Sequence, residues 1–547
     1  MTPEKLMRRA RELAEAGQTE DAWRAIEPLT ADAASDIELA RLWSALAGFS
    51  PEPDDRMAEA AVDIISRYAG EPSLIAVAAS VLVLVGEGRP FDEAPLANGP
   101  ARIAADTISG LISGLSPAQR EDPSVATDLY SELAMALRLT GSQDDEAALE
   151  AINHALRLDP ENGLLWFRLG LIHKWRGRWR EGVEANQRAH ELGDTDGLLW
   201  NLAICAMGAG DHALAGSVMK DLSMKGTVGK DGIFTGSFDG TQVRVSTLGE
   251  GIDPAAHVVG SEPAFENLWI ERLSLVHGKI TNASMYDLPV DYGDIVLFDG
   301  APVSWRDDGT TRTPRFPLLQ KLRSGAYRRY RFLARQPRGG FLTSINESLP
   351  EETFFYVHDE QVNMLCGECA RGGKIVHDHT EPESFLVSGK FVVPKDRLDS
   401  TLVEMLEKLA GDGAVIAIPQ LFHDLGDAAR AARDEERWHV IEEEREEARF
   451  QANCEVHGTT APAFVCKHLG TGKDLGFFTS EDSEGARPDA WCSECEEVRI
   501  AGGGDWNDQS EELLGITLIC VHCYDQAQKR NEAGPRKKKR RLLFWRK

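Results

Sequence analysis

Eight cysteine and histidine residues near the carboxyl end of the chain have the spacing of metal ligands. They form four pairs, each with one or two residues between its members: Cys454 and His457, Cys466 and His468, Cys492 and Cys495, and Cys520 and Cys523. Such a gap lets both members of a pair reach one ion, and Zn²⁺ prefers four tetrahedral nitrogen or sulfur ligands. We therefore expect these side chains to bind two zinc ions.

The spacing leaves open how the four pairs combine. In one arrangement, the two Cys-x2-Cys pairs hold one ion and the two pairs that contain histidine hold the other. An interleaved cross-brace, in which partners are exchanged between the sites, is the alternative. In both cases each ion has four protein ligands and keeps no position for water. We therefore expect the metal to stabilise the fold of this segment rather than to act in catalysis.

A second group of potential ligands lies further upstream and comprises Cys366, Cys369, His377 and His379. Four ligands at this spacing could form a structural site with two cysteines and two histidines, which would hold a third zinc ion. Alternatively, the two histidines could bind a catalytic metal together with an acidic third ligand. The chain would then be a metal-dependent, hydrolase-like enzyme.

Cysteine usage predicts a reducing compartment. Eight of the nine cysteines lie in the last third of the chain, and each has another cysteine or histidine two or three residues away. Thiols at this spacing are more often metal ligands than disulfides. No amino-terminal signal is visible, and the most apolar stretch, Leu74–Val85, is shorter than the roughly 18–20 residues that cross a bilayer. We expect a buried helix there, no transmembrane segment and a cytoplasmic protein.

The elements that precede these ligands begin with a helical array. Residues 1–225 read as successive helices, rich in Ala and Leu and separated by short turns. The tetrapeptide Gly163–Trp166 recurs at 197–200, a shift of 34 residues. That shift is the period of the tetratricopeptide repeat.

Residues 125–225 resemble the tetratricopeptide family in more detail. Trp166, Leu169 and Gly170 match the start of a repeat. The positions that close the preceding repeat are matched by Ala148, Ile152, Ala155 and Pro160. The resemblance implies an α-helical solenoid whose groove binds a partner protein.

The residues between the array and the ligands are predicted to form an α+β domain at 226–423. Ile233–Val245 alternates like a β-hairpin around Asp239-Gly240. Further strands are expected at 294–298, 352–357 and 385–393, and a helix at 398–409. Residues 424–452 are so rich in charge that we expect a solvated linker helix.

The net charge of −28 argues against a surface that binds nucleic acid throughout. Two basic segments are exceptions. Arg323–Arg338 combines six arginines with three aromatic residues, which could grip phosphates and stack on bases, or simply form a strand whose arginines neutralise this acidic chain. Residues 529–547 form a basic tail, predicted to be disordered, that could contact nucleic acid, an anionic membrane surface or an acidic partner.

These observations predict a multidomain protein. It would comprise an all-α helical-repeat region at 1–225, an α+β domain at 226–423, the linker helix, a small zinc module at 453–528 and the basic tail. The zinc module resembles treble-clef and zinc-ribbon modules in general. We expect a non-enzymatic adaptor that binds a partner protein through its helical array. The metal-dependent enzyme and a nucleic-acid-associated zinc protein are the two alternatives.

Overall fold

The computed structural model describes most of the chain and divides it into two compact units, residues 1–326 (unit 1) and 327–547 (unit 2). The described residues are 2–87, 99–193, 197–229, 233–246, 258–259, 262–263, 265–307, 311–361, 364–365, 385–411, 413–449, 452–454, 456–480, 487–501 and 515–532. The division falls inside the range that the sequence predicts for the middle domain, and the predicted domain boundaries stay predictions.

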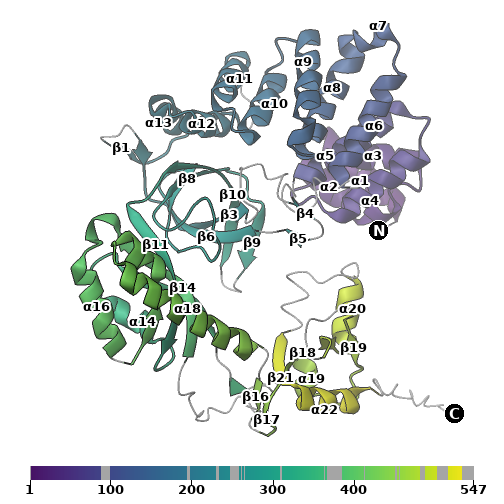
Figure 1. Ribbon diagram of the computed structural model, residues 1–547. Coiled ribbons are helices and arrows are strands. Elements are labelled where there is room, and N and C mark those ends of the chain that lie inside the picture. The colour runs from purple at the N-terminus through teal and green to yellow at the C-terminus, as the bar shows by residue number, and fades with distance from the viewer. Residues whose placement is uncertain are drawn as a thin grey trace, which may run out of the picture. The chain divides into compact units, whose positions relative to one another are not determined.

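Unit 1 begins with a run of helices (Figure 1). They are α1 (Pro3–Glu15), α2 (Thr19–Ile26), α3 (Ile37–Ala47), α4 (Asp55–Arg67), α5 (Pro72–Glu87), α6 (Pro100–Gly114), α7 (Pro117–Arg120), α8 (Pro123–Leu139), α9 (Asp145–Leu158), α10 (Gly163–Trp175), α11 (Trp179–Leu192), α12 (Leu198–Gly208) and α13 (His212–Asp221). Several begin at an Asp or Asn side chain that accepts hydrogen bonds from the first turn, as Asp36 does for α3 and Asn162 for α10.

Successive helices pack as antiparallel pairs, as the tetratricopeptide resemblance predicts for α8–α13. Small residues allow this close packing. A Cβ atom added to Gly170 of α10 would lie 2.4 Å from the Asn186 amide of α11, and one added to Gly182 of α11 would lie 2.7 Å from the sulfur of Cys205. The region is therefore tetratricopeptide-like in its helix pairing.

The apolar segment at 74–85 is a helix, as predicted, and it is buried along most of its length, with Val77 as its exposed residue. It belongs to α5, whose side chains join the main hydrophobic core of the helical array. Within the part of the chain that the structure describes, no helix combines the length and the apolar character that a membrane span requires.

A closed, mostly antiparallel sheet follows the helices in unit 1. Its strands, with two small ladders beside it, are β1 (Thr227–Val228), β2 (Phe234–Thr235), β3 (Thr241–Ser246), β4 (Val258–Val259), β5 (Glu262–Pro263), β6 (Phe265–Arg272), β7 (His277–Ile280), β8 (Ile295–Phe298), β9 (Ser304–Asp307) and β10 (Arg312–Arg323). The order is β3-β6-β7-β8-β10-β9, and a parallel pairing of β3 with β10 closes the sheet on itself. Apolar side chains from these strands fill its interior.

The hairpin predicted at 233–245 is wrong. Strand β2 pairs with β1, whereas β3 pairs with β6 and β10. The alternation of apolar residues indicated two strands correctly, but it carries no information on which partner each strand chooses.

The closed sheet covers the end of the helical array. Helices α12 and α13 share one hydrophobic core with the sheet, to which β2, β8 and β10 contribute Phe234, Leu297 and Leu319. A buried ion pair joins a further helix to the sheet, because Lys174 Nζ of α10 lies 2.5 Å from Asp299 Oδ2, directly after β8. The last helix pair of a solenoid exposes apolar surface unless something caps it, and here the sheet provides the cap.

Unit 2 begins with a four-stranded antiparallel sheet of order β12-β14-β11-β15. The elements are β11 (Tyr327–Gln336), α14 (Phe341–Ser344), β12 (Phe354–Gln361), β13 (Met364–Leu365), β14 (Phe385–Pro394), α16 (Ser400–Gly411), β15 (Val415–Ala417), α17 (Pro419–Asp424) and α18 (Ala428–Arg449). The strands and the helix that the sequence predicted in 294–409 correspond to β8, β12, β14 and α16. A core of aromatic and aliphatic side chains lies between this sheet and its helices.

The basic segment 323–338 forms strand β11 for most of its length. Its three aromatic side chains, Tyr327, Tyr330 and Phe332, are buried and are not available to stack on bases. Arg335 forms an ion pair with Glu444. The structure thus agrees with the interpretation of these arginines as partners for the chain's own acidic groups.

Helix α18 corrects the prediction of a solvated linker. Every third or fourth residue, from Ala431 through Trp438 and Ile441 to Arg445, is buried or half-buried, and the helix packs on β11 and β15. Most of the acidic residues between these positions are exposed. Because these charged residues lie between the buried ones, the periodic stripe of buried positions is hard to recognise in the sequence. Even a charged member of the stripe has a partner, because Arg445 lies 2.6 Å from Asp359.

Candidate metal centres

The predicted ligands lie on short strands and on the helices that follow them. The elements are β16 (Ala452–Cys454), β17 (Gly458–Thr460), β18 (Pro462–Cys466), α19 (Lys467–Thr471), β19 (Phe478–Thr479), β20 (Ala490–Trp491), α20 (Ser493–Ala501), β21 (Ile516–Cys520) and α22 (Val521–Asn531). One pair occupies the β16–β17 hairpin, and each of the other three lies where a strand passes into a helix. This arrangement places ligands at helix N-termini, where the backbone dipole favours thiolates.

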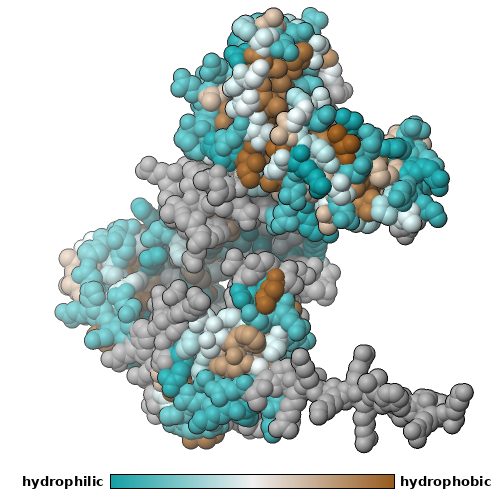
Figure 2. Space-filling view, turned by 90° about the vertical axis from the view of Figure 1, so that its right-hand side faces the viewer, coloured by the Kyte–Doolittle hydropathy of each residue, from teal (hydrophilic) through white to brown (hydrophobic). Residues whose placement is uncertain are grey.

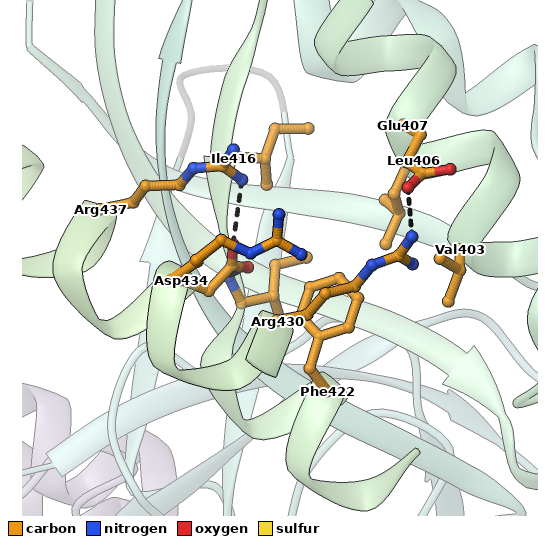
Figure 3. A pocket seen from close by; sticks show the side chains of 10 residues that line it. Val403, Leu406, Glu407, Ile416, Phe422, Arg430, Asp434 and Arg437 are labelled. Carbon is orange, nitrogen blue, oxygen red and sulfur yellow. Dashed lines mark hydrogen bonds and ion pairs between the residues drawn. The ribbon is translucent and has the colours of Figure 1, made fainter. Parts of the chain in front are cut away.

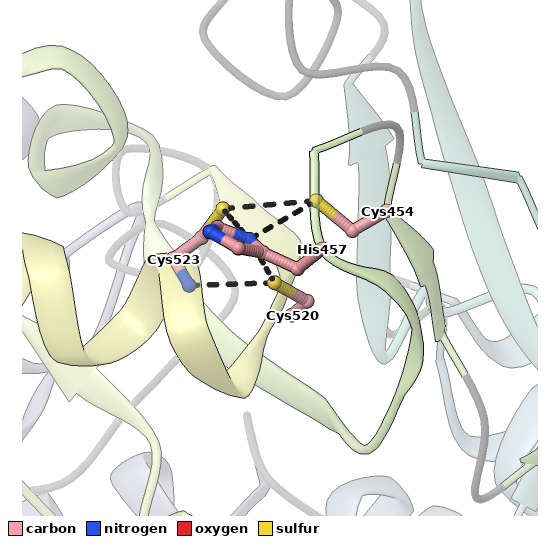
Figure 4. A group of neighbouring side chains, drawn as sticks. All are labelled: Cys454, His457, Cys520 and Cys523. Atoms are coloured by element: carbon pink, nitrogen blue, oxygen red, sulfur yellow. Dashed lines mark hydrogen bonds between the residues drawn. The ribbon is translucent and has the colours of Figure 1, made fainter.

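The first set of converging side chains, the outer group, consists of Cys454, His457, Cys520 and Cys523. The hairpin supplies the first two residues and the start of α22 supplies the other two, and all four side chains point toward one another (Figure 4). A hairpin thus faces the first turn of a helix across this group.

The second set, the inner group, consists of Cys466, His468, Cys492 and Cys495. These residues come from the junction of β18 with α19 and the junction of β20 with α20. In each group the candidate ligand atoms all lie within 4.8 Å of one another. Each group could therefore hold one metal ion.

The distances within both groups suit a tetrahedral cation. Bonds of about 2.3 Å to sulfur and 2.0–2.1 Å to nitrogen imply edges of about 3.8 Å between sulfurs and 3.6 Å between sulfur and nitrogen. The sulfurs of Cys492 and Cys495 are 3.7 Å apart, and those of Cys454 and Cys523 are 3.9 Å apart. Sulfur–nitrogen distances range from 3.2 to 3.6 Å. A disulfide would need about 2.05 Å between sulfurs, so the thiols are free.

Strand register explains why the pairs combine in this nested order. Strand β18 pairs with β21 so that Pro462 lies opposite Cys520. Cys466 is four residues further along β18, roughly 13 Å away at the usual rise of a strand. At that end it meets Cys492 instead, because β18 also pairs with β20 through Val465 and Ala490. The grouping by pair type is therefore wrong. Partners are exchanged between the two sites, as the alternative proposed, but the pairs combine in a nested and not in an interleaved order.

Two separate ions follow from the same geometry. The two metals of a dinuclear catalytic site lie about 3.5–4 Å apart and share ligands. Here the groups share no ligand, and they lie at opposite ends of the β18–β21 ladder. Each group would also supply all four ligands from the protein, which leaves no position for a water or a substrate.

Burial raises the pKa of thiols in both groups, namely Cys466 and Cys495 in the inner group and Cys523 in the outer group. The sulfurs of the inner group are buried among Val465, Leu469 and Trp491. Burial, together with the neighbouring thiols, raises the pKa of Cys495, and burial likewise raises the pKa of Cys523 to about 12. Neutral thiols would be left crowded together in the core of a small module, whereas a bound cation would turn them into thiolate ligands.

Polar contacts surround the two groups. The second ring nitrogen of His457 lies 3.4 Å from the Gln526 side-chain nitrogen, and such a partner orients a metal ligand. Two other contacts stabilise the rest of the module. Tyr524 donates a 2.7 Å hydrogen bond to the Pro488 carbonyl, and Asn531, at the end of α22, bonds to the backbone of the loop after α19.

The other predicted ligands lie outside the described residues. This holds for all four members of the upstream group, Cys366, Cys369, His377 and His379, and for the basic run and aromatic end of the tail beyond residue 532. The third metal site and the tail contacts accordingly stay predictions.

Comparison with known proteins assigns no family, because neither a family model nor a curated protein matches the chain. One similar solved structure is PilF of Pseudomonas aeruginosa, which is 11% identical over 40% of this chain and 90% of its own, with a TM-score of 0.28. Another is MamA of Desulfovibrio magneticus RS-1, which is 15% identical over 35% of this chain and 94% of its own, with a TM-score of 0.24. A human IFIT1 dimer with m7Gppp-AAAA is 17% identical over 41% of this chain and 50% of its own, with a TM-score of 0.30. Scores this low support no inference about function.

Proposed function

We propose that this chain is a zinc-containing adaptor that binds a partner protein through its helical array. The observation that carries the proposal is the convergence of eight cysteine and histidine side chains into two complete groups of four. Complete groups serve folding rather than catalysis, so the chemistry of this module is structural. The paired helices supply the surface for a partner.

Zinc is the cation that fits the donor set best. Each group offers three sulfurs and one imidazole nitrogen in a tetrahedral arrangement. Magnesium and calcium prefer oxygen ligands, whereas thiolate-rich tetrahedral sites favour zinc. The cysteines of both groups are free thiols, which agrees with a reducing compartment, and we propose the cytoplasm as the location.

The partner surface is proposed to lie on the row formed by α5, α8 and α10. These helices contact one another in turn along one side of the array. Each carries an exposed apolar residue in its first two turns, namely Val77, Val125 and Leu164. Figure 2 shows hydrophobic residues exposed among hydrophilic ones on the helical array. Exposed apolar residues on neighbouring helices of a solenoid are the kind of surface that binds a protein segment.

The partner surface can be tested by placing charges on it. In the double variant Val125→Glu/Leu164→Glu, two exposed apolar side chains become carboxylates, which should not unfold the array. Val228→Glu is a matched control, because Val228 is equally exposed but lies on β1. Proteins crosslinked to each tagged full-length chain in extract of its source would be identified by mass spectrometry.

We expect a partner that the parent chain and the Val228→Glu control recover and the double variant loses. If all three chains recover the same proteins, the surface is wrongly placed. If the parent chain recovers none, the adaptor proposal fails. Metal analysis of the same preparations tests the zinc part separately, since it should give at least two zinc ions in every variant.

A further inference from the structure

A second site of a different kind lies in unit 2. Helices α16, α17 and α18 and strand β15 surround an open cleft with a cavity volume of about 160 Å³ (Figure 3). One wall is apolar, and its residues are Val403, Leu406, Ile416, Ile418 and Phe422. The opposite wall is the face of α18 that carries Arg430, Arg433 and Arg437.

The three arginines follow one another on a single side of α18. Their spacing of three and four residues aligns them on one helix face over about 10 Å. Two of them are already paired. Arg430 forms an ion pair with Glu407 across the cleft, and Arg437 lies 3.1 Å from Asp434 (Figure 3).

Arg433, the middle arginine, differs from its neighbours. None of the described carboxylates forms an ion pair with it, and its hydrogen bond is a long one of 3.4 Å to the Ala429 carbonyl of its own helix. Arg430, by contrast, forms ion pairs with both Glu407 and Asp427, and Arg437 forms one with Asp434. Arg433 is thus the guanidinium of the cleft that none of the described ion pairs neutralises.

The buried carboxylate of Asp434 keeps the polar wall in place. It accepts a 2.8 Å hydrogen bond from the Ile418 amide, which ties α18 to the end of β15. The guanidinium of Arg430 also lies over the Phe422 ring at 5.8 Å. The arginine wall and the apolar wall are thus linked through side chains that fix their separation, and such a preformed cleft loses little entropy when it binds a ligand.

We propose that this cleft binds a small molecule in which a carboxylate ends an apolar chain. The guanidinium of Arg433 would donate two parallel hydrogen bonds to the carboxylate, and the hydrocarbon would lie against Val403 and Phe422. A single guanidinium without a described ion pair suits one carboxylate, and the apolar wall offers no donor to the further oxygens of a phosphate. Pockets of this type, mostly apolar with a few polar groups, are the usual form of small-molecule sites.

The proposal can be tested on the full-length chain with three probes by isothermal titration calorimetry. Octanoate has both the carboxylate and the apolar chain, 1-octanol has only the chain, and inorganic phosphate has only the anion. We expect saturable binding of octanoate at one site, affinity at least about tenfold lower for 1-octanol because the charged contact is lost, and no saturation by phosphate up to about 10 mM.

Two variants locate the site. Arg433→Gln should lower octanoate affinity about tenfold or more and leave 1-octanol unchanged. Lys408→Gln is the matched control, since it removes an exposed positive charge from α16 outside the cleft and should have no effect. Arg433 is exposed, and equal melting temperatures would confirm that both variants fold. Equal binding of octanoate and 1-octanol, absence of octanoate binding, or identical affinities of the two variants would each overturn the proposal.

Discussion

Replacing Lys174 by methionine should destabilise unit 1 by about 3–5 kcal/mol. The Lys174 ammonium lies 2.5 Å from the Asp299 carboxylate, and the two side chains are only 6% and 5% exposed. Methionine has a similar length but no charge. The Asp299 carboxylate would stay buried, with the 3.2 Å hydrogen bond from the Ala301 amide and the attraction of the Arg138 charge as its remaining described interactions. Breaking one side of a buried pair is costly for this reason.

The size of the effect depends on the charge that is left behind. In the double variant Lys174→Met/Asp299→Asn neither charge remains, so most of the stability should return, to within about 1–2 kcal/mol of the parent chain. Arg41→Met is the control, because it breaks an ion pair of 3.0 Å with Glu71 in which the side chains are 50% and 46% exposed. Its cost should be below about 1 kcal/mol.

Urea unfolding followed by far-ultraviolet circular dichroism measures these differences as free energies of unfolding. Because the pair joins α10 to the closed sheet, the comparison also tests whether the sheet stabilises the helical array. The reasoning is refuted if Lys174→Met costs no more than Arg41→Met. It is equally refuted if the double variant is as unstable as Lys174→Met alone.

Three further predictions concern unit 2 and its metal groups. A strong chelator should unfold residues 452–532 and leave the helices of unit 1 intact. Hydrogen exchange can measure this segment by segment. If the amides of 452–532 stay as protected from exchange as before, the prediction is contradicted. Gly389→Ala should cost about 1–3 kcal/mol, because the new Cβ would lie 2.0 Å from a backbone oxygen of β12, whereas Gly110→Ala in open space on α6 should stabilise by about 0.5–1 kcal/mol. Equal urea midpoints of the two variants would count against both values. Burial raises the pKa of Asp434, so its carboxylate destabilises the folded state at neutral pH and this penalty is relieved as pH falls. The stability of the parent chain relative to Asp434→Asn should therefore increase from pH 7 toward about pH 4, and a constant or shrinking difference would exclude this linkage.

The candidate ligands could be recognised in the sequence because their signal is local. A gap of one or two residues between Cys466 and His468, or between Cys492 and Cys495, is enough to suggest a shared ion. How the pairs combine is not local. It depends on the register that sets Pro462 opposite Cys520, and no pattern of ligand types encodes this register.

The same distinction explains the other differences between sequence and structure. The helices of residues 1–225 were predictable because their apolar periodicity and turn residues lie within each segment. Helix α18 was predicted as a helix but not as part of a core. Its stripe at 431, 434, 438, 441 and 445 is regular enough to have been found, yet two of the five residues are charged. The pairing of β3 with β10 joins residues about 70 positions apart and had no sequence signal.

Zinc counts on two double variants test the nested arrangement of the metal groups most directly. Cys466→Ala/Cys492→Ala removes two ligands of the inner group, so the full-length chain should lose one zinc ion relative to the parent. Cys454→Ala/Cys466→Ala removes one ligand from each group, so it should lose two. Loss of two ions by the first variant, or of only one by the second, would contradict the account.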